Sequence, residues 1–563
     1  MKDTESMDPA ELEMIWGRLR SAANEQAATL VRTAFSSVVR DLADYACAIF
    51  DEAGCLVAQA DSNTPGLCCS MGRMLAYMLR TFPGPSLRPG DILVSNNPWE
   101  ATGHHNDITL YTPVFFNGAL IAYTASAAHQ IDIGGRRTDL QSRDNYEEGL
   151  RIPVCKLYKQ GQPNEDVFAF IRANVRHPET VVGDIRAQVA ANHVAARRLE
   201  TIAEGLGEVE LKTVCDEINR RSRELMLAAL ARLPAGCYEA SQHVESIYGQ
   251  PVDLRVAVRI SPKEILLDFA GTSRQSPIAI NCTLAYTTSY ALFSVYTVLN
   301  LKTPINEGIL SCLRVEAPEA SIVNATFPAP VFARSMVGNL IPELVYRALA
   351  PVLPEQVMSS SGSSPVWLQN FFGTGPDGRP FSALNAVSGG MGARFGVDGL
   401  SCLYFPVNIK NLPVEIMESN IPILVEKRAL SPDSCGHGRS RGGFGQEFAF
   451  RVLDGDLGPR GGLDFVARGG RAYPVSGLFG GTGVGVCRIE LNGEPLAQEW
   501  MGAHLEANDR VSFFAPGGGG LGAASERSPT AVEQDVASGL LSADVASAFY
   551  GYTGPGEHAA ADK

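Results

Sequence analysis

The sequence predicts an α+β fold of several domains, with mixed sheets, helical segments and a glycine-rich, β-dominated C-terminal region. At 563 residues the chain is too long for one hydrophobic core, and the usual length relation gives about three or four domains. Residues 166–233 show helical spacing of apolar positions, whereas residues 381–514 show short β-like runs separated by glycine. We therefore expect four parts, which are residues 1–235, 236–380, 381–530 and 531–563.

The first part combines helices with short strands. Helical spacing runs from about Asp8 to Ser36, and Asp8 followed by Pro9 is typical of a helix start. Two short strands are expected in ACAIFDEAGCLVAQA, residues 46–60. A further helix is expected at residues 73–82, and a Pro-Gly-Pro sequence ends it.

Strand-like alternation replaces the helical pattern after residue 235, in HVESIYG, VDLRVAVRIS and EILLDFAG. Helical patterns return near residues 287–298 and 342–353. A final helix is expected over residues 531–550, before a polar tail that we expect to be disordered.

Two glycine-rich stretches, GGTGVG (480–485) and PGGGG (516–520), have the composition of phosphate-binding loops. Neither has the lysine and Ser/Thr of a P-loop, nor the strand, acidic residue and helix of a dinucleotide site. We interpret their glycines as turn formers, and we expect the chain not to bind ATP by itself.

Composition excludes several classes of protein. The formal net charge is −14 and no basic run compensates it, so we expect no nucleic-acid or anionic-membrane partner. The N-terminal sequence lacks the pattern of a signal peptide, and no apolar run reaches the length of a membrane span. The twelve cysteines are scattered, which favours a reducing cytoplasm. Cys435, near His437, is more simply an inert loop cysteine than a nucleophile.

The segment from Gly103 to Gly135 contains a predicted β-hairpin. Asn117-Gly118 lies between two apolar, β-rich runs and is a strong signal for a two-residue turn. If Phe116 pairs with the residue after this turn, counting outward brings His129 opposite Asn106. Pro113 cannot donate to the ladder and implies an edge strand or a bulge, which would shift the pairing by one residue.

This hairpin, residues 104–132, gathers a set of imidazole and carboxylate groups. Two His-x-x-Asp pairs, His104 with Asp107 and His129 with Asp132, come together near its open end. Such a mixed set suits Mn, Fe or Zn. His105 would face the other way. Alternatively, these are ordinary hydrogen-bonded polar residues where a hairpin meets a loop, and spacing alone leaves both interpretations open.

Further blocks follow in an order that is typical of one family. They are Asn-Asn-Pro-Trp (96–99) before His104-x-x-Asp107, Ala-His-x-x-Asp-Ile-Gly-Gly (128–135), EEGLRIP (147–153), LDFAGTS (267–273), INEG (305–308), SGGMGAR (388–394), NLPVEIME (411–418), SPDS (431–434), RGGFG (441–445) and PGGGGLG (516–522). With these blocks the chain resembles the hydantoinase B/oxoprolinase family over nearly its full length.

The resemblance implies a component of a hetero-oligomer, with a hydantoinase A type partner that binds and hydrolyses ATP. For such hydrolases the resemblance implies that ATP phosphorylates the amide oxygen of a cyclic amide, the small-molecule substrate, and that water then opens the ring at a metal site in the B-type subunit. A metal lowers the pKa of water, which supplies a nucleophile near neutral pH. Related acetone and acetophenone carboxylases use similar subunits.

The resemblance also suggests roles for individual residues. His104, Asp107 and His129 are the expected metal ligands, with Asp132 either a fourth ligand or a catalytic carboxylate that orients an imidazole. Glu147 or Glu148 would act as general base or hold the substrate. A plain surface glutamate pair explains these two residues equally well.

The chain departs from the family's usual pattern at several positions. The usual histidine and aspartate are replaced by Leu67 and Asn97. The loop after Gly134-Gly135 brings Arg136, Arg137 and Arg143 close to the expected site, where they would bind a phosphate, a carboxylate or bicarbonate of the substrate. Alternatively, these arginines pair with Asp139 and Asp144 as a solvated charge cluster.

Three hypotheses follow. The first is a metal-dependent subunit of an ATP-dependent cyclic amide (hydantoin, lactam or oxoproline) hydrolase. The second is a subunit of an ATP-dependent ketone carboxylase, and the third is a non-catalytic scaffold.

Overall fold

The computed structural model describes residues 7–136, 140–207, 209–374, 379–454, 462–470, 473–497 and 502–554. The chain forms two compact units. Unit 1 comprises residues 1–240, 254–341 and 408–410, and unit 2 comprises residues 241–253, 342–407 and 411–563. The tail after residue 554, predicted to be disordered, lies outside the described residues.

Unit 1 contains a seven-stranded antiparallel sheet in the order β2-β1-β5-β4-β3-β6-β7. Its strands are β1 (Tyr45–Asp51), β2 (Leu56–Gln59), β3 (Ile92–Ser95), β4 (Asp107–Phe116), β5 (Ala119–His129), β6 (Cys155–Lys159) and β7 (Gln162–Pro163). The central strands β1, β4 and β5 are largely buried, which agrees with their small and apolar side chains.

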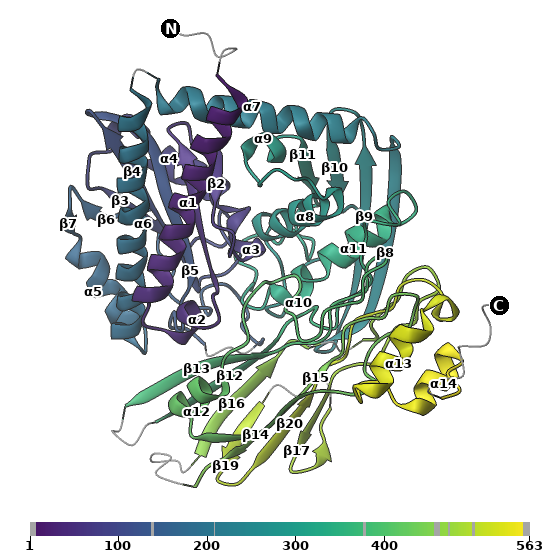
Figure 1. Ribbon diagram of the computed structural model, residues 1–563. Helices are drawn as coiled ribbons and strands as arrows, with labels where there is room; N and C mark the ends of the chain where they lie inside the picture. Colours follow the sequence, from purple (N-terminus) through teal and green to yellow (C-terminus); the bar gives the residue numbers. More distant parts are fainter. Residues whose placement is uncertain are drawn as a thin grey trace. The chain divides into compact units, whose positions relative to one another are not determined.

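Two long helices, α1 (Pro9–Thr33) and α6 (Pro178–Leu206), lie side by side across this sheet (Figure 1). The predicted start of the first helix is confirmed, because the Asp8 side chain accepts a hydrogen bond from the Ala10 N–H. Buried amides join helices to strands: Gln26 donates to the Ala125 carbonyl and Gln188 to the Ile108 carbonyl. The other helices of this region are α2 (Ser37–Arg40), α3 (Pro65–Cys68), α4 (Met71–Thr81), η2 (Gly84–Ser86), α5 (Glu165–Asn174) and α7 (Leu211–Leu230).

A second sheet has the order β11-β10-β9-β8, in which β10 and β11 are parallel. Its strands are β8 (Gly236–Ile247), β9 (Gln250–Ile260), β10 (Ile265–Asp268) and β11 (Leu313–Glu316). The helices that follow are α8 (Leu284–Leu299), α9 (Glu307–Leu310), α10 (Ser335–Gly338) and α11 (Ile341–Leu349). The start of β8 agrees with the change of pattern predicted near residue 235.

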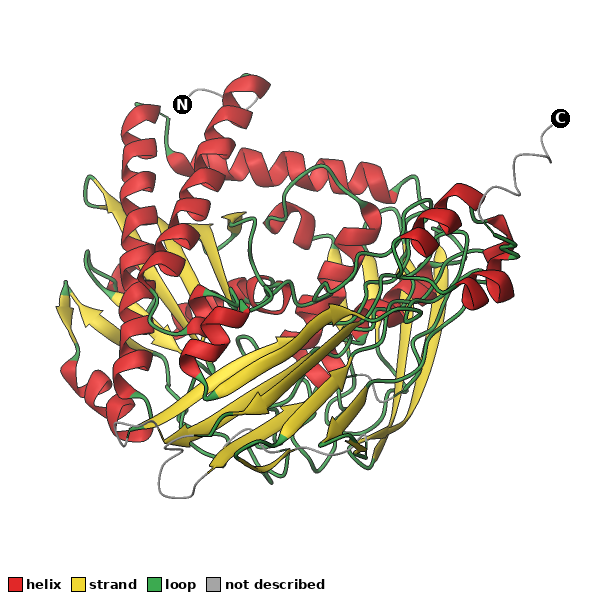
Figure 2. Ribbon diagram, turned by 60° about the horizontal axis from the view of Figure 1, so that its bottom comes forward, coloured by secondary structure: helices red, strands yellow, loops and turns green. Residues whose placement is uncertain are grey.

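Unit 2 contains two facing sheets, in the orders β13-β12-β16-β19 and β14-β15-β20-β17-β18 (Figure 2). Aromatic side chains fill the space between them: Trp367 contacts Phe513 and Phe371 contacts Phe450, with ring centroids 4.7 and 5.4 Å apart. The strands are β12 (Trp367–Thr374), β13 (Pro380–Val387), β14 (Ile423–Leu430), β15 (Gln446–Val452), β16 (Gly462–Arg468), β17 (Arg488–Leu491), β18 (Glu494–Pro495), β19 (Gly502–Glu506) and β20 (Arg510–Phe514). Together with the helices, these sheets confirm the α+β class.

The remaining helices of unit 2 are α12 (Val414–Asn420), η3 (Ala524–Glu526), α13 (Pro529–Ala537) and α14 (Ala543–Tyr550). The prediction of one continuous final helix over residues 531–550 is wrong, because two helices are present there. The chain leaves α13 through Gly539, which has φ 72°, and the Ser542 side chain caps α14 by accepting from the Val545 N–H.

The glycines of residues 516–520 are not turn formers, and that prediction is wrong. They lie in extended chains that pack backbone against backbone: the Gly518 N–H donates to the Gly443 carbonyl, and the Gly519 N–H donates to the Ser360 carbonyl, both at 2.9 Å. A Cβ on Gly518 would lie 2.0 Å from the Met391 carbonyl oxygen. Glycine is required here because no side chain fits between the chains.

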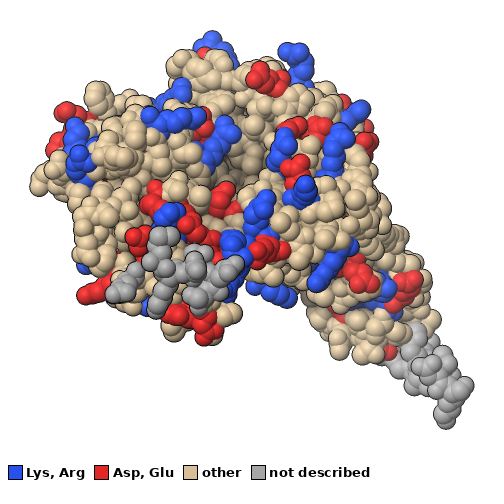
Figure 3. Space-filling model, turned by 90° about the horizontal axis from the view of Figure 1, so that it is seen from above, with Lys and Arg blue, Asp and Glu red and all other residues tan. Residues whose placement is uncertain are grey.

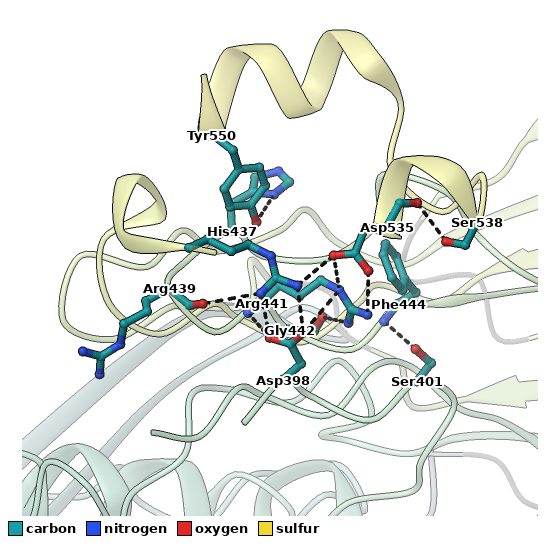
Figure 4. A network of polar contacts seen from close by, with 11 residues as sticks. Asp398, Ser401, His437, Arg439, Arg441, Gly442, Phe444, Asp535, Ser538 and Tyr550 are labelled. Atoms are coloured by element: carbon teal, nitrogen blue, oxygen red, sulfur yellow. Dashed lines mark hydrogen bonds and ion pairs between the residues drawn. The ribbon is translucent and has the colours of Figure 1, made fainter. Parts of the chain in front are cut away.

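An ion-pair network joins Asp398 and the glycine-rich segment 441–445 to α13 (Figure 4). Asp535 of α13 accepts from Arg441 at 2.9 Å and from Arg527 at 2.8 Å, and Arg527 also donates to Asp398 at 2.8 Å.

Cys435 lies near this network and is 1% exposed, and burial raises the pKa of its thiol to about 12. Its thiolate is therefore scarce near neutral pH.

None of the described helices is both long enough and apolar enough to cross a membrane. On the face shown in Figure 3, basic and acidic side chains are interspersed.

Candidate metal centre

The hairpin of β4 and β5 forms as predicted at its turn but not along its whole length. Asn117 and Gly118 both have positive φ, and Phe116 pairs with Ala119. A bulge beside Pro113 then shifts the register by one residue, so the prediction that His129 lies opposite Asn106 is wrong. His129 pairs with Asp107 instead.

This register brings three candidate ligands together. The Asp107 Oδ1 atom lies 2.8 Å from His104 Nε2 and 2.9 Å from His129 Nδ1. One donor atom from each residue lies within 4.8 Å of the other two, and all three residues are buried. Two imidazoles and a carboxylate that converge in this way fit a divalent cation such as Mn, Fe or Zn.

The atoms that face away from the cluster are fixed by other residues. His104 Nδ1 lies 3.3 Å from the Phe332 carbonyl oxygen, which leaves Nε2 as the ligand atom. Arg334 donates to Asp107 Oδ2 at 2.7 Å and also to the Thr102 carbonyl. Its guanidinium lies 4.3 Å from the centre of the Tyr286 ring. These contacts orient the ligands before any metal binds.

The environment sets the protonation states that a metal requires. Burial and the adjacent Arg334 guanidinium lower the pKa of His104 to about 3, so its imidazole is neutral near pH 7. Burial disfavours the charged form of Asp107, but the neighbouring imidazole and guanidinium groups outweigh it and hold the pKa of this carboxyl well below its usual range.

Sequence reasoning missed Arg334 and Asp44. Arg334 lies 227 positions from Asp107 in the chain, and no local pattern indicates the contact. Asp44 Oδ2 lies 3.8 Å from His129 Nδ1, and burial raises the pKa of Asp44. The pairing of β1 with β5, which sets Tyr45 opposite Ala128, would have placed Asp44 beside the site.

Asp132 does not join the cluster. Its carboxylate accepts from Arg176 Nη1 at 2.7 Å and also from the Arg176 backbone N–H. His105 is buried but is not part of the cluster either, and burial lowers its pKa to about 4.

The two predicted glutamates have different surroundings. Glu147 pairs with Arg143 at 2.7 Å and lies 3.8 Å from Arg136, as in a surface charge cluster. Glu148 is buried and accepts from the backbone N–H groups of Val331 and Phe332 at 2.7 and 2.8 Å.

Burial raises the pKa of Glu148 to about 7. Through its hydrogen bond to the Phe332 N–H, Glu148 holds the loop whose Phe332 carbonyl faces His104. Neither glutamate is among the candidate ligands.

Two of the residues named in the sequence analysis, Arg137 and Asp139, lie outside the described residues. At the positions that depart from the usual pattern, Leu67 packs in an apolar cluster and Asn97 accepts from the Trp99 N–H.

Comparison with known proteins agrees with the predicted family. The profile described as Hydantoinase B/oxoprolinase matches residues 8–524. The putative B component of a D-/L-hydantoinase from Pseudomonas sp. (strain NS671) is 29% identical, with 98% of this chain and 96% of that protein aligned. The 5-oxoprolinase PfmaA of Pestalotiopsis fici is 27% identical over 92% of this chain, but only 42% of that longer protein is covered.

Two solved structures share the fold. The ATP-dependent caprolactamase from Pseudomonas jessenii superposes with a TM-score of 0.89 at 26% identity, covering 98% of this chain and 97% of that one. An acetone carboxylase structure has a TM-score of 0.87 at 19% identity, covering 98% and 81%, and this likeness concerns the fold alone. The chain belongs to the hydantoinase B/oxoprolinase family.

Proposed function

We propose that this chain is the metal-dependent B-type subunit of an ATP-dependent cyclic amide hydrolase. The observation that supports the proposal most strongly is the buried cluster of His104, Asp107 and His129, whose donor atoms converge in the protonation states that a divalent metal requires. The related hydantoinase component and caprolactamase support the substrate class.

The chemistry requires a better leaving group and a nucleophile, because an unstrained amide is a poor electrophile. A metal held by the cluster would supply Lewis acidity that makes water nucleophilic near neutral pH. The chain's own residues orient the site: the Phe332 carbonyl fixes the His104 tautomer, and Arg334 fixes the Asp107 carboxylate. Glu148 holds the Phe332 backbone in place.

Activation of the amide by ATP is assigned to a hydantoinase A type partner. The glycines at 516–520 are packed against neighbouring backbone, so this stretch has no room for a phosphate. One relative is named as one component of a hydantoinase and another as an ATP-dependent caprolactamase, and these names support a divided activity.

The function is tested by mixing the chain with its partner, ATP and a panel of hydantoin, caprolactam and 5-oxoproline. Ring opening that needs both proteins, ATP and His129 is the expected result. The ketone carboxylase alternative predicts instead that acetone or acetophenone is consumed only when bicarbonate is present. Turnover of neither class by a folded, metal-loaded complex would favour a scaffold.

A further inference from the structure

We propose that an aromatic face of unit 1, formed by Trp99, Tyr146, Phe327 and Arg151, is the docking surface for the ATP-using partner. The proposal rests on the proposed function and names where its partner binds. Tyr146 is 71% exposed and Phe327 is 41% exposed, although both are large aromatic side chains. Exposed aromatic clusters of this kind are typical of protein interaction sites.

The side chains of the face contact one another in series. The Phe327 ring contacts Trp99 on one side and Tyr146 on another, with ring centroids 5.2 and 5.4 Å apart, and both contacts are edge-to-face. The Arg151 guanidinium lies 4.8 Å from the centre of the Phe327 ring. Tryptophan, tyrosine and arginine are the residue types that contribute most to binding at protein interfaces.

Hydrogen bonds hold the loops of this face in place. The Trp99 indole N–H donates to the Ala325 carbonyl at 2.8 Å, and the Asn145 N–H donates to the Pro328 carbonyl at 2.8 Å. The face is therefore arranged before a partner arrives, which lowers the entropic cost of binding. Glu148 joins the same two loops next to the candidate metal centre, because it accepts hydrogen bonds from the backbone N–H groups of Val331 and Phe332. A partner bound here would therefore lie near the loops that orient the ligands.

The charges point to the kind of partner. Arg143, three positions before Tyr146 in the chain, exposes 85% of its side chain, whereas its partner Glu147 exposes only 19%. Arg151 is also exposed. Guanidinium groups therefore face outward, and they fit a partner whose contacting rim is acidic.

The length of the relatives supports a protein partner. This chain covers 42% of 5-oxoprolinase PfmaA, so most of that polypeptide has no counterpart here. If the activity is shared, a protein part that corresponds to the uncovered portion must contact this chain, and a preformed aromatic face is suited to that contact.

The test uses isothermal titration calorimetry to measure how tightly the full chain binds its hydantoinase A type partner. Tyr146→Ser and the double variant Tyr146→Ser/Phe327→Ser are compared with Phe170→Ser, which removes an aromatic ring that is 69% exposed on α5. The double variant is expected to weaken binding on the order of 100-fold and Tyr146→Ser about tenfold, while the control changes less than about threefold.

Circular dichroism and metal content check that the variants are folded. Because the Tyr146 ring is mostly exposed, the single variant remains informative if the double variant does not fold. Unchanged affinity in Tyr146→Ser and in any folded double variant, with the wild type still active, would overturn the docking surface and leave the proposed function intact. Loss of self-association instead of partner binding would assign the face to a second copy. A wild-type chain that binds no partner would contradict both proposals.

Discussion

The buried Glu148 should make the protein less stable as the pH rises, and Glu148→Gln should remove this effect. The wild-type carboxyl is 2% exposed and its pKa is raised by burial to about 7, compared with an ordinary value of 4.5. The folded state therefore binds the proton more tightly than the unfolded state. Stability from this group is full below pH 4.5 and is lost as the pH rises through about 7.

The size of the effect follows from these two pKa values. Their separation corresponds to about 3 kcal/mol when ionisation is complete, and roughly 2–3 kcal/mol of it develops between pH 5 and pH 8. Glutamine keeps a carbonyl oxygen that can accept from the Val331 and Phe332 N–H groups, but it cannot ionise.

The assay is urea unfolding of the metal-free protein at pH 5 and pH 8, followed by circular dichroism. Relative to Glu148→Gln, the wild type should lose roughly 2–3 kcal/mol of unfolding free energy between the two pH values. The control is Glu147→Gln, because the pairing of Glu147 with Arg143 lowers the pKa of the Glu147 carboxyl and moves its titration below the tested range. A stability difference between wild type and Glu148→Gln that is equal at both pH values would refute this reasoning.

Three further predictions concern the site and the glycine-rich loops. Arg334→Met should lower the unfolding free energy of the metal-free protein by about 3–5 kcal/mol in urea, because the buried charge of Asp107 loses its partner. A loss of less than about 1 kcal/mol would contradict a stabilising role of this ion pair. Asp44→Asn should weaken metal binding about tenfold in a chelator competition, and equal affinities would remove Asp44 from the site. Gly518→Ala should abolish soluble expression, because its Cβ would lie 2.0 Å from a carbonyl oxygen. The control Gly485→Ala should express normally, because no atom lies within 4 Å of the added Cβ. Normal expression of both variants would show that the backbone packing at Gly518 is less tight.

Local chemistry in the sequence was enough to predict two local features of unit 1. The Asn117-Gly118 turn and the Asp8 cap both form, since each depends on neighbouring residues only. The pairing of His129 was wrong by one residue because a bulge depends on how the whole strand fits its sheet. The loss of a backbone donor at Pro113 indicated that risk but not its outcome.

Contacts between distant parts of the chain were not predictable. Arg334 contacts Asp107 across 227 positions, and Glu148 contacts Phe332 across 184 positions. No periodic pattern in the sequence predicts contacts at such separations. The glycines at 516–520 were misinterpreted because close packing of backbones leaves the same composition as a series of turns.

The most direct test of the metal centre is elemental analysis of the purified wild type, His129→Ala and, as control, His193→Ala, whose histidine is exposed on α6. The account predicts about one divalent metal per chain in the wild type and the control, and loss of that metal in His129→Ala. Equal metal content in all three proteins, or none in any of them after incubation with Mn, Fe and Zn, would contradict it.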